Sequence, residues 1–364
     1  MTVARVPFRL LAGVLAVVLV TAACGGDSGT TAEAVGPDVA IEASPAFLAS
    51  VADRSEAASY RFELDMDMTM DLGFQAIVID PDEPFMYGEQ ASTEQLAMTI
   101  DLGTFFDAMV ESMGDLGGDM GDLLPDGDTM RIDLVVDGDT LWMRAPVFAE
   151  LGQLDPSVAA DPMAAPFLSL GDQWGRIDLG QLEGKIPAGD LAQLAGTQTV
   201  APSDMLALLD DVDQVTEIGT DEIRGVAVTG LRATTTFGAL LEAQGQSLED
   251  LQEQMGLGGD VDPITARELE QAMASFLDAP AAVTVWVDRA GMLRRFESRT
   301  DLGALMSEMA GDMGGLGLEL DFSVGYSMDV FDYGQVDAID VPTPERPVDL
   351  TSLFGSLVSG TTVS

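Results

Sequence analysis

Residues 61–72, RFELDMDMTMDL, alternate strictly between apolar and polar side chains, and this pattern limits the fold more than any other feature. A period of two predicts one long β-strand with an apolar face and a face in water. The apolar face consists of Phe62, Leu64, Met66, Met68, Met70 and Leu72. At about 3.3 Å per residue this strand would extend about 40 Å, far beyond the usual five or six residues.

The same alternation recurs along the chain. LAMTIDL places Leu96, Met98, Ile100 and Leu102 on one face, and MRIDLVV does the same for Met130, Ile132, Leu134 and Val136. Further strands are predicted in 223–237, 281–302 and 318–331, and the last places Phe322, Val324 and Tyr326 together. Turns at Asp137-Gly138-Asp139 and Arg289-Ala290-Gly291 indicate hairpins. Strands of this kind, joined by turns, predict an antiparallel sheet with one face in water.

The first residues carry the most specific signal in the sequence. Arg5 and Arg9 precede an apolar run, LLAGVLAVVLV, that is too short to span a bilayer comfortably and indicates a signal peptide. The run ends in VTAAC, and its Cys24 is the only cysteine of the chain. This resembles a bacterial lipobox, which implies diacylglycerol on Cys24, cleavage before it and often N-acylation, for example with palmitate. The alternative is an ordinary secretory peptide in which Cys24 is incidental.

Charge and composition exclude several classes of function. A formal net charge of -46 would repel nucleic acid. The chain has no histidine, which removes the usual general base, the imidazole metal ligand and any Ser-His-Asp triad. No phosphate-binding loop is present, and we predict no cofactor, no metal and no enzymatic activity. A calcium site in the acidic loop 117–128 and a copper(I) site made of methionines are weaker alternatives.

The remaining segments suggest how the chain is organised. We expect a signal peptide at 1–23, the lipidated Cys24 with a flexible tether to 43, one domain at 44–345 and a tail at 346–364 that docks as a final helix. Ser44-Pro45 predicts a helix over about 45–58 with Ser44 as its N-cap. Met- and Gly-rich acidic insertions are expected near 103–125, 238–262 and 303–316. They represent either a loose internal repeat or the same composition used three times.

A long one-sided strand must cover its apolar face with helices, a second sheet or a ligand. Methionine is flexible and polarizable, so it suits a cavity wall that accepts several ligand shapes. It suits equally a packed core in which it fills irregular gaps. The side chains predicted to form a cavity wall are Phe62, Leu64, Met66, Met68, Met70, Leu96, Met98, Ile100, Leu134, Phe322 and Val324.

Several segments resemble the LppX/LprAFG-type lipoproteins of actinobacteria and, more broadly, the LolA-like lipoprotein-carrier superfamily. They are Cys24, SYRFELDMDM, GDTLWMR with the later DQWGRID, VTEIGTDEIRGVAVTGLRATTTF, VTVWVDRAGMLRRFESRTDL and FDYGQVDAIDVPTPE. The resemblance covers about 44–345. It implies an α+β fold, a strongly curved antiparallel half-barrel whose concave face is covered by helices. It also implies a hydrophobic cavity for the acyl chains of a lipid or lipoglycan.

Together these features predict a lipoprotein on the extracytoplasmic face of the cell membrane that binds or carries a hydrophobic ligand without catalysis. The alternative is an envelope sensor or scaffold that uses the same fold to bind a protein partner and has no lipid cargo. Fold alone does not separate these two functions.

Overall fold

The computed structural model describes residues 43–56, 58–71, 76–81, 83–112, 129–149, 170–182, 215–236, 280–301 and 321–353, with single positions between them. Several expectations fall outside the described residues: the signal peptide, Cys24, most of the tether, the acidic loop 117–128, most of the three insertions and the end of the tail.

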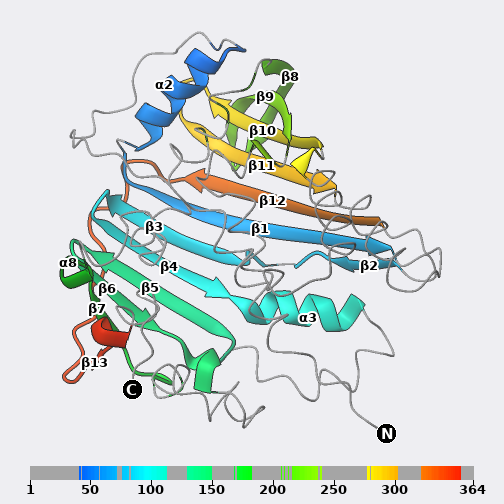
Figure 1. The fold of residues 1–364 in the computed structure, drawn as a ribbon. Helices are drawn as coiled ribbons and strands as arrows, with labels where there is room; N and C mark the ends of the chain where they lie inside the picture. Colours follow the sequence, from blue (N-terminus) through cyan, green and yellow to red (C-terminus); the bar gives the residue numbers. More distant parts are fainter. Residues whose placement is uncertain are drawn as a thin grey trace, which may run out of the picture.

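An open sheet of thirteen strands dominates the described part of the chain (Figure 1). Its strands are β1 (Tyr60–Asp71), β2 (Ala76–Ile79), β3 (Met86–Ser92), β4 (Gln95–Asp101), β5 (Arg131–Asp137), β6 (Thr140–Arg144), β7 (Gly175–Asp178), β8 (Val215–Ile223), β9 (Val226–Thr236), β10 (Pro280–Asp288), β11 (Leu293–Asp301), β12 (Asp321–Phe331) and β13 (Val348–Asp349). The order across the sheet is β13-β7-β6-β5-β4-β3-β1-β12-β11-β10-β9-β8, and β2 pairs with β1. All pairs are antiparallel except β13 with β7.

The long strand predicted from the alternating pattern is confirmed as β1, which has 12 residues and lies near the middle of the sheet. It pairs with β12 from Arg61 opposite Phe331 to Asp71 opposite Asp321, so segments from the two ends of the chain become neighbours. Both predicted turns are confirmed. Gly138 and Gly291 adopt positive φ values of 55° and 77°, which glycine tolerates better than other residues.

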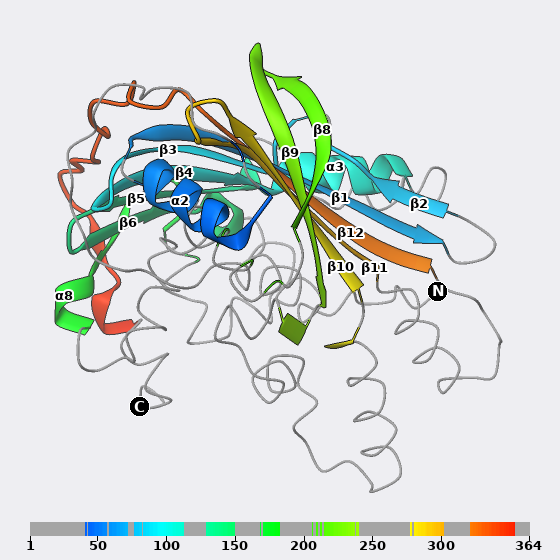
Figure 2. The same cartoon turned by 90° about the horizontal axis from the view of Figure 1, so that it is seen from above.

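The sheet arches strongly, and helix α2 (Pro45–Glu56) lies inside the arch (Figure 2). Ser44 caps this helix as predicted, because its hydroxyl accepts a hydrogen bond from the Phe47 N–H at 3.2 Å. At the other end the buried Ser55 hydroxyl accepts a hydrogen bond from the Leu293 N–H at 3.0 Å, which fixes α2 to the start of β11.

Two further helices in the described ranges follow strands directly, and residues 146–149 are also helical. Helix α3 (Leu102–Ser112) is the start of the first predicted insertion, and the Asp101 carboxylate caps it through the N–H groups of Gly103 and Thr104. Helix α8 (Leu179–Leu182) follows β7. Phe105 of α3 and Leu182 of α8 belong to the same buried cluster as α2. Cover of the concave face by helices, as expected from the resemblance, is not confirmed.

The segment after β12 runs across the convex face of the sheet. Val336 and Ile339 pack there against Val135 of β5, beside Trp142 and Trp174. β13 then joins the edge of the sheet beside β7, so the sheet continues beyond residue 345 into the predicted tail. A final helix is described only for 351–353.

Most of the core lies on the concave side of the arch. Leu48 and Val51 of α2 belong to the same buried cluster as Phe62, Met98 and Val285 from three strands of the sheet. The described chain is thus an open, curved and mostly antiparallel sheet with few helices. No described helix is both long and apolar enough to cross a bilayer.

Candidate functional site

The pairing of β1 with β12 assembles the central part of the predicted apolar wall. Leu64 lies opposite Met328, Met66 opposite Tyr326, Met68 opposite Val324 and Met70 opposite Phe322. Directly opposed residues of an antiparallel pair point to the same face, with their Cβ atoms about 5 Å apart. The predicted residues of β1 and β12 therefore form one continuous surface on the concave side.

On the other side of β1, Gly88 of β3 connects the wall to β4. It lies opposite both Phe62 and Met98. A Cβ at this position would meet the Phe62 Cζ at 2.7 Å, so the absent side chain provides the space for the Phe62 ring. Met98 in turn lies opposite Leu134 of β5. All eleven predicted wall residues thus share the concave face, where Leu96 and Ile100 flank Met98 on β4.

Burial along this wall is graded from one end to the other. Phe62 is 1% exposed and Met66 3%. Tyr333 and Tyr60 cover the Phe62 end, with the rings of these two tyrosines 6.0 Å apart. Met68, Met70 and Phe322, at the other end, are only half-buried. The wall is therefore a packed core at the end near α2 and keeps some accessible surface at the far end. We call Met68, Met70, Phe322 and Tyr326 the open end of the wall.

Sequence reasoning missed several members of the same surface. Met328 and Tyr326 lie in the alternating pattern of 318–331 and could have been included on that signal alone. Phe296, opposite Met328, also belongs to an alternating segment. Met86 is 2% exposed and lies in β3, whose sequence MYGEQAS gives no clear strand signal.

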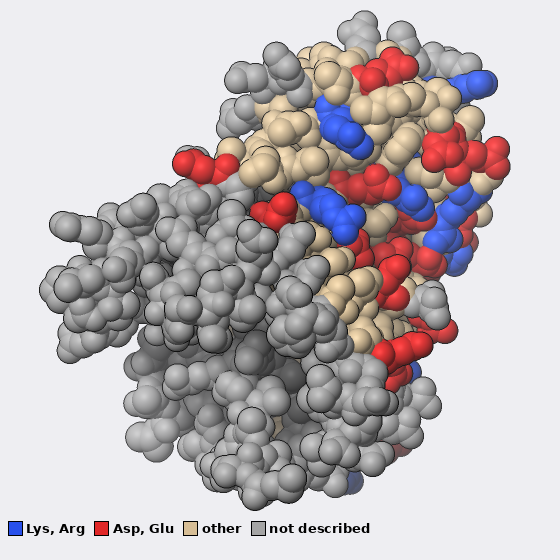
Figure 3. Space-filling model, turned by 90° about the vertical axis from the view of Figure 1, so that its right-hand side faces the viewer, with Lys and Arg blue, Asp and Glu red and all other residues tan. Residues whose placement is uncertain are grey.

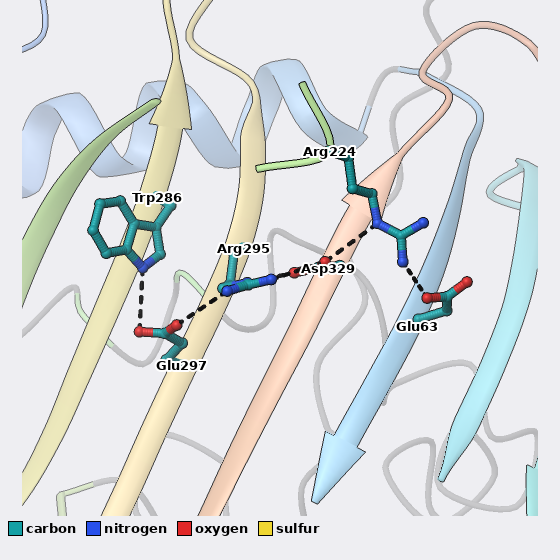
Figure 4. Close-up of polar contacts among 6 residues, drawn as sticks. All are labelled: Glu63, Arg224, Trp286, Arg295, Glu297 and Asp329. Atoms are coloured by element: carbon teal, nitrogen blue, oxygen red, sulfur yellow. Dashed lines mark hydrogen bonds and ion pairs between the residues drawn. The ribbon is translucent and has the colours of Figure 1, made fainter. Parts of the chain in front are cut away.

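The convex face of the same strands carries charge instead of apolar side chains. The Asp329 carboxylate binds Arg295 through two contacts, at 2.5 Å and 3.0 Å (Figure 4). It also accepts a hydrogen bond from Arg224 at 3.2 Å, and Arg224 continues to Glu63 of β1. Asp329 is 7% exposed, so its charge needs these partners.

Arg224 reaches this network from the turn between β8 and β9. It has a positive φ of 49°, and its guanidinium lies over the Phe331 ring at 3.9 Å. Hydrogen bonding to Asp329 raises the pKa of Arg295. Burial, followed by the charges of Asp329 and Glu63, raises the pKa of Asp65. The network joins the turn to β11, β12 and β1, and its role is structural.

The charge of the described surface is mixed. Figure 3 shows arginines interspersed with acidic side chains over the described part of the face in view. Pairs such as Arg299 of β11 with Asp67 of β1, at 2.8 Å, place the two signs side by side across β12, where Gly325 lies between them. In the part of the chain that the structure describes, no group of three or more Asp, Glu, His or Cys residues could hold a metal ion.

Comparisons with known proteins give weak similarities. No protein-family model matches the chain, and no curated protein matches it. Among solved structures, LprF from Mycobacterium bovis is 10% identical, covers 82% of this chain and 96% of its own, and gives a TM-score of 0.33. LppX from Mycobacterium tuberculosis is 12% identical over 81% of this chain and 99% of its own, with a TM-score of 0.30.

A lipoprotein-sorting protein domain from Vibrio parahaemolyticus is 7% identical over 79% of this chain and 89% of its own, with a TM-score of 0.21. Such low TM-scores mean loose superpositions, so function has to be argued from the residues of the chain itself. By their names, the second of these structures is a lipoprotein and the third is a domain of an outer membrane lipoprotein-sorting protein.

Proposed function

We propose that this chain is a lipid-anchored protein of the cell envelope that binds an acyl-chain ligand against the concave face of its sheet, without covalent chemistry. The observation that carries the proposal is the open end of the wall. There, methionines and a phenylalanine from both ends of the sequence lie side by side and remain half-buried.

The chemistry of the open end fits an acyl chain. Met68 and Met70 offer flexible thioether side chains, which adapt to different ligand shapes better than branched residues do. Burial of ten methylene groups contributes about 8 kcal/mol, which is comparable with the roughly 4–15 kcal/mol that association costs in lost freedom. Ten methylene groups therefore about offset this cost, and useful affinity needs a longer acyl chain or a second one.

Anchoring rests on the lipobox-like sequence ending in Cys24. Two or three acyl chains on that residue would hold the protein stably at a membrane surface. The tether up to residue 43 is small and polar, and it would let the sheet stand off the bilayer. Such an arrangement suits either carrying a lipid between membrane surfaces or sensing its presence.

Native mass spectrometry of the mature chain tests the proposal. The wild-type chain should release acyl lipid on denaturation. Met68→Glu with Met70→Glu should abolish that lipid, because each places a charge on the wall. Thr69→Glu is the matched control: it lies between them on β1, faces the convex side, and should retain the lipid.

Circular dichroism would verify that all variants fold. A wild-type chain that carries no lipid and takes up none from vesicles would contradict the proposal. It would favour the alternative, an envelope protein that binds a protein partner.

A further inference from the structure

Three hydroxyl groups lie together on the concave face at the open end of the wall, and Thr235 lies on the same face beyond Ala281. Ser298 of β11 lies directly opposite Tyr326 of β12, and Thr300 lies opposite Val324 two positions further along. Opposed Cβ atoms lie about 5 Å apart and diagonal ones about 7–8 Å apart. Ser298, Thr300 and Tyr326 therefore form one patch, which we call the hydroxyl patch.

Thr300 is buried and yet has no hydrogen-bond partner for its side chain among the described residues. Six polar residues are classed as buried there: Ser55, Thr284, Asp288, Thr300, Asp329 and Thr351. The other five each use the side chain in a hydrogen bond to a described residue. A hydroxyl that is shut away from water without a partner costs about 1–3 kcal/mol, so Thr300, at 6% exposure, depends on whatever reaches its oxygen.

The Thr300 hydroxyl is not fully enclosed. In the described ranges, the completely enclosed side-chain nitrogens or oxygens without a partner belong to Arg54 and Arg131 only. The Thr300 oxygen therefore still borders open space. Water can therefore supply the missing hydrogen bond, and so can a bound molecule that takes its place.

Tyr326 adds a second donor to the patch. Burial raises the pKa of its phenol to about 12, so the O–H group stays protonated at any ordinary pH and can donate a hydrogen bond. Its side chain packs against the apolar core, and Met66 is its neighbour on β1. An aromatic ring with a hydroxyl at its tip suits a boundary between an apolar chain and a polar group.

The surroundings of the hydroxyl patch select against a charged ligand group. On this face the cross-strand neighbours of the three residues are Val283, Ala281, Val324 and Met66, none of which carries charge. A carboxylate placed there would be desolvated without a counter-ion, and burial of an unpaired charge is costly. A neutral acceptor such as a carbonyl oxygen meets no such penalty.

We propose that the hydroxyl patch is a polar subsite that holds an uncharged hydrogen-bond acceptor of the ligand, such as the carbonyl of an acyl ester, while the acyl chain lies along the open end of the wall. This inference rests on the proposed function and narrows it. It assigns Thr300 and Tyr326 as residues that distinguish esterified acyl chains from plain hydrocarbons and from free fatty acids.

The test uses the full mature chain, with Cys24→Ser, and three probes of similar length: methyl laurate, pentadecane and laurate. Each probe competes with the neutral dye Nile red. Wild type should bind methyl laurate more tightly than the other two. Thr300→Val combined with Tyr326→Phe should weaken the binding of methyl laurate about fivefold more than that of pentadecane, the effect of about one lost neutral hydrogen bond.

Matched controls remove the same atoms from the convex face. Thr69→Val and Tyr87→Phe lie on β1 and β3, and both should bind the three probes as wild type does. If the double variant binds methyl laurate as tightly as wild type, or loses pentadecane equally, the subsite is wrong and the apolar wall still stands. If wild type binds none of the probes, both the subsite and the proposed function are wrong.

Discussion

Replacing Gly88 with alanine should destabilise the sheet where the wall crosses from β1 to β4. The new Cβ would lie 2.3 Å from the Ala97 carbonyl oxygen, 2.7 Å from the Phe62 Cζ and 2.9 Å from the Met98 Cα. Two of these atoms are backbone of β4, held in place by pairing on both sides of that strand. They cannot retreat as the end of a flexible side chain could.

The strands must therefore separate or the Phe62 ring must leave its position. Overpacking of this kind costs about 1–3 kcal/mol. Urea unfolding followed by tryptophan fluorescence should show a clearly lower midpoint with an unchanged slope. Gly180→Ala provides the control, because the nearest atom to its Cβ would be the Asp178 Oδ1 at an ordinary 3.5 Å. If Gly88→Ala unfolds at the same urea concentration as Gly180→Ala, the reasoning about this close approach is wrong.

Two further predictions concern the convex face. Arg295→Ala should lower the free energy of unfolding, measured with urea, by about 1–3 kcal/mol, because it removes two contacts of the buried Asp329. Arg299→Ala breaks only an exposed ion pair and should change the free energy of unfolding by less than about 1 kcal/mol. Folding raises the pKa of Asp65 above its value in the unfolded chain. The protonated carboxyl therefore adds stability at pH values below the pKa of the unfolded chain, and this added stability is lost as the pH rises through the pKa of the folded protein. Asp65→Asn should therefore be slightly more stable than wild type at neutral pH, and denaturant titrations should show that this advantage vanishes near about pH 4. An advantage of the same size at all pH values would show that it does not come from the ionisation of Asp65.

The alternating segments could be predicted because burial of one face imposes a period of two on the residues. β1, β4, β5 and β12 were predicted in this way, with their faces assigned correctly. The predicted helix after Ser44 was also confirmed, since a capping hydroxyl followed by proline is a local signal.

β3 could not be predicted from local signals. Its sequence MYGEQAS includes a glycine and few β-formers, and the reason for that glycine is the Phe62 ring from another strand. The pairing of β1 with β12 was likewise invisible, because their residues are separated by most of the chain. Local patterns define which face a residue occupies, whereas tertiary packing decides which strands become neighbours.

For the candidate wall, too, the sequence predicted which face the residues occupy but not how they pack. The eleven residues predicted to form a cavity wall lie on one face of the sheet, yet the sequence did not reveal that burial falls from Phe62 to the half-buried Met70. That gradient depends on Tyr333, which follows β12, and on α2, which precedes β1. The hydroxyl patch was missed because Ser298 and Thr300 disturb the apolar pattern and were read as ordinary strand residues.

The most direct test of ligand binding along the open end of the wall uses methyl resonances of the methionines. The mature chain, labelled with carbon-13 at the methionine methyl groups, would be titrated with a doxyl spin-labelled methyl stearate and followed by NMR. We predict strong broadening of Met68 and Met70, and little effect on Met292 in the turn between β10 and β11. Unchanged Met68 and Met70 signals, with the ligand bound, would contradict the account.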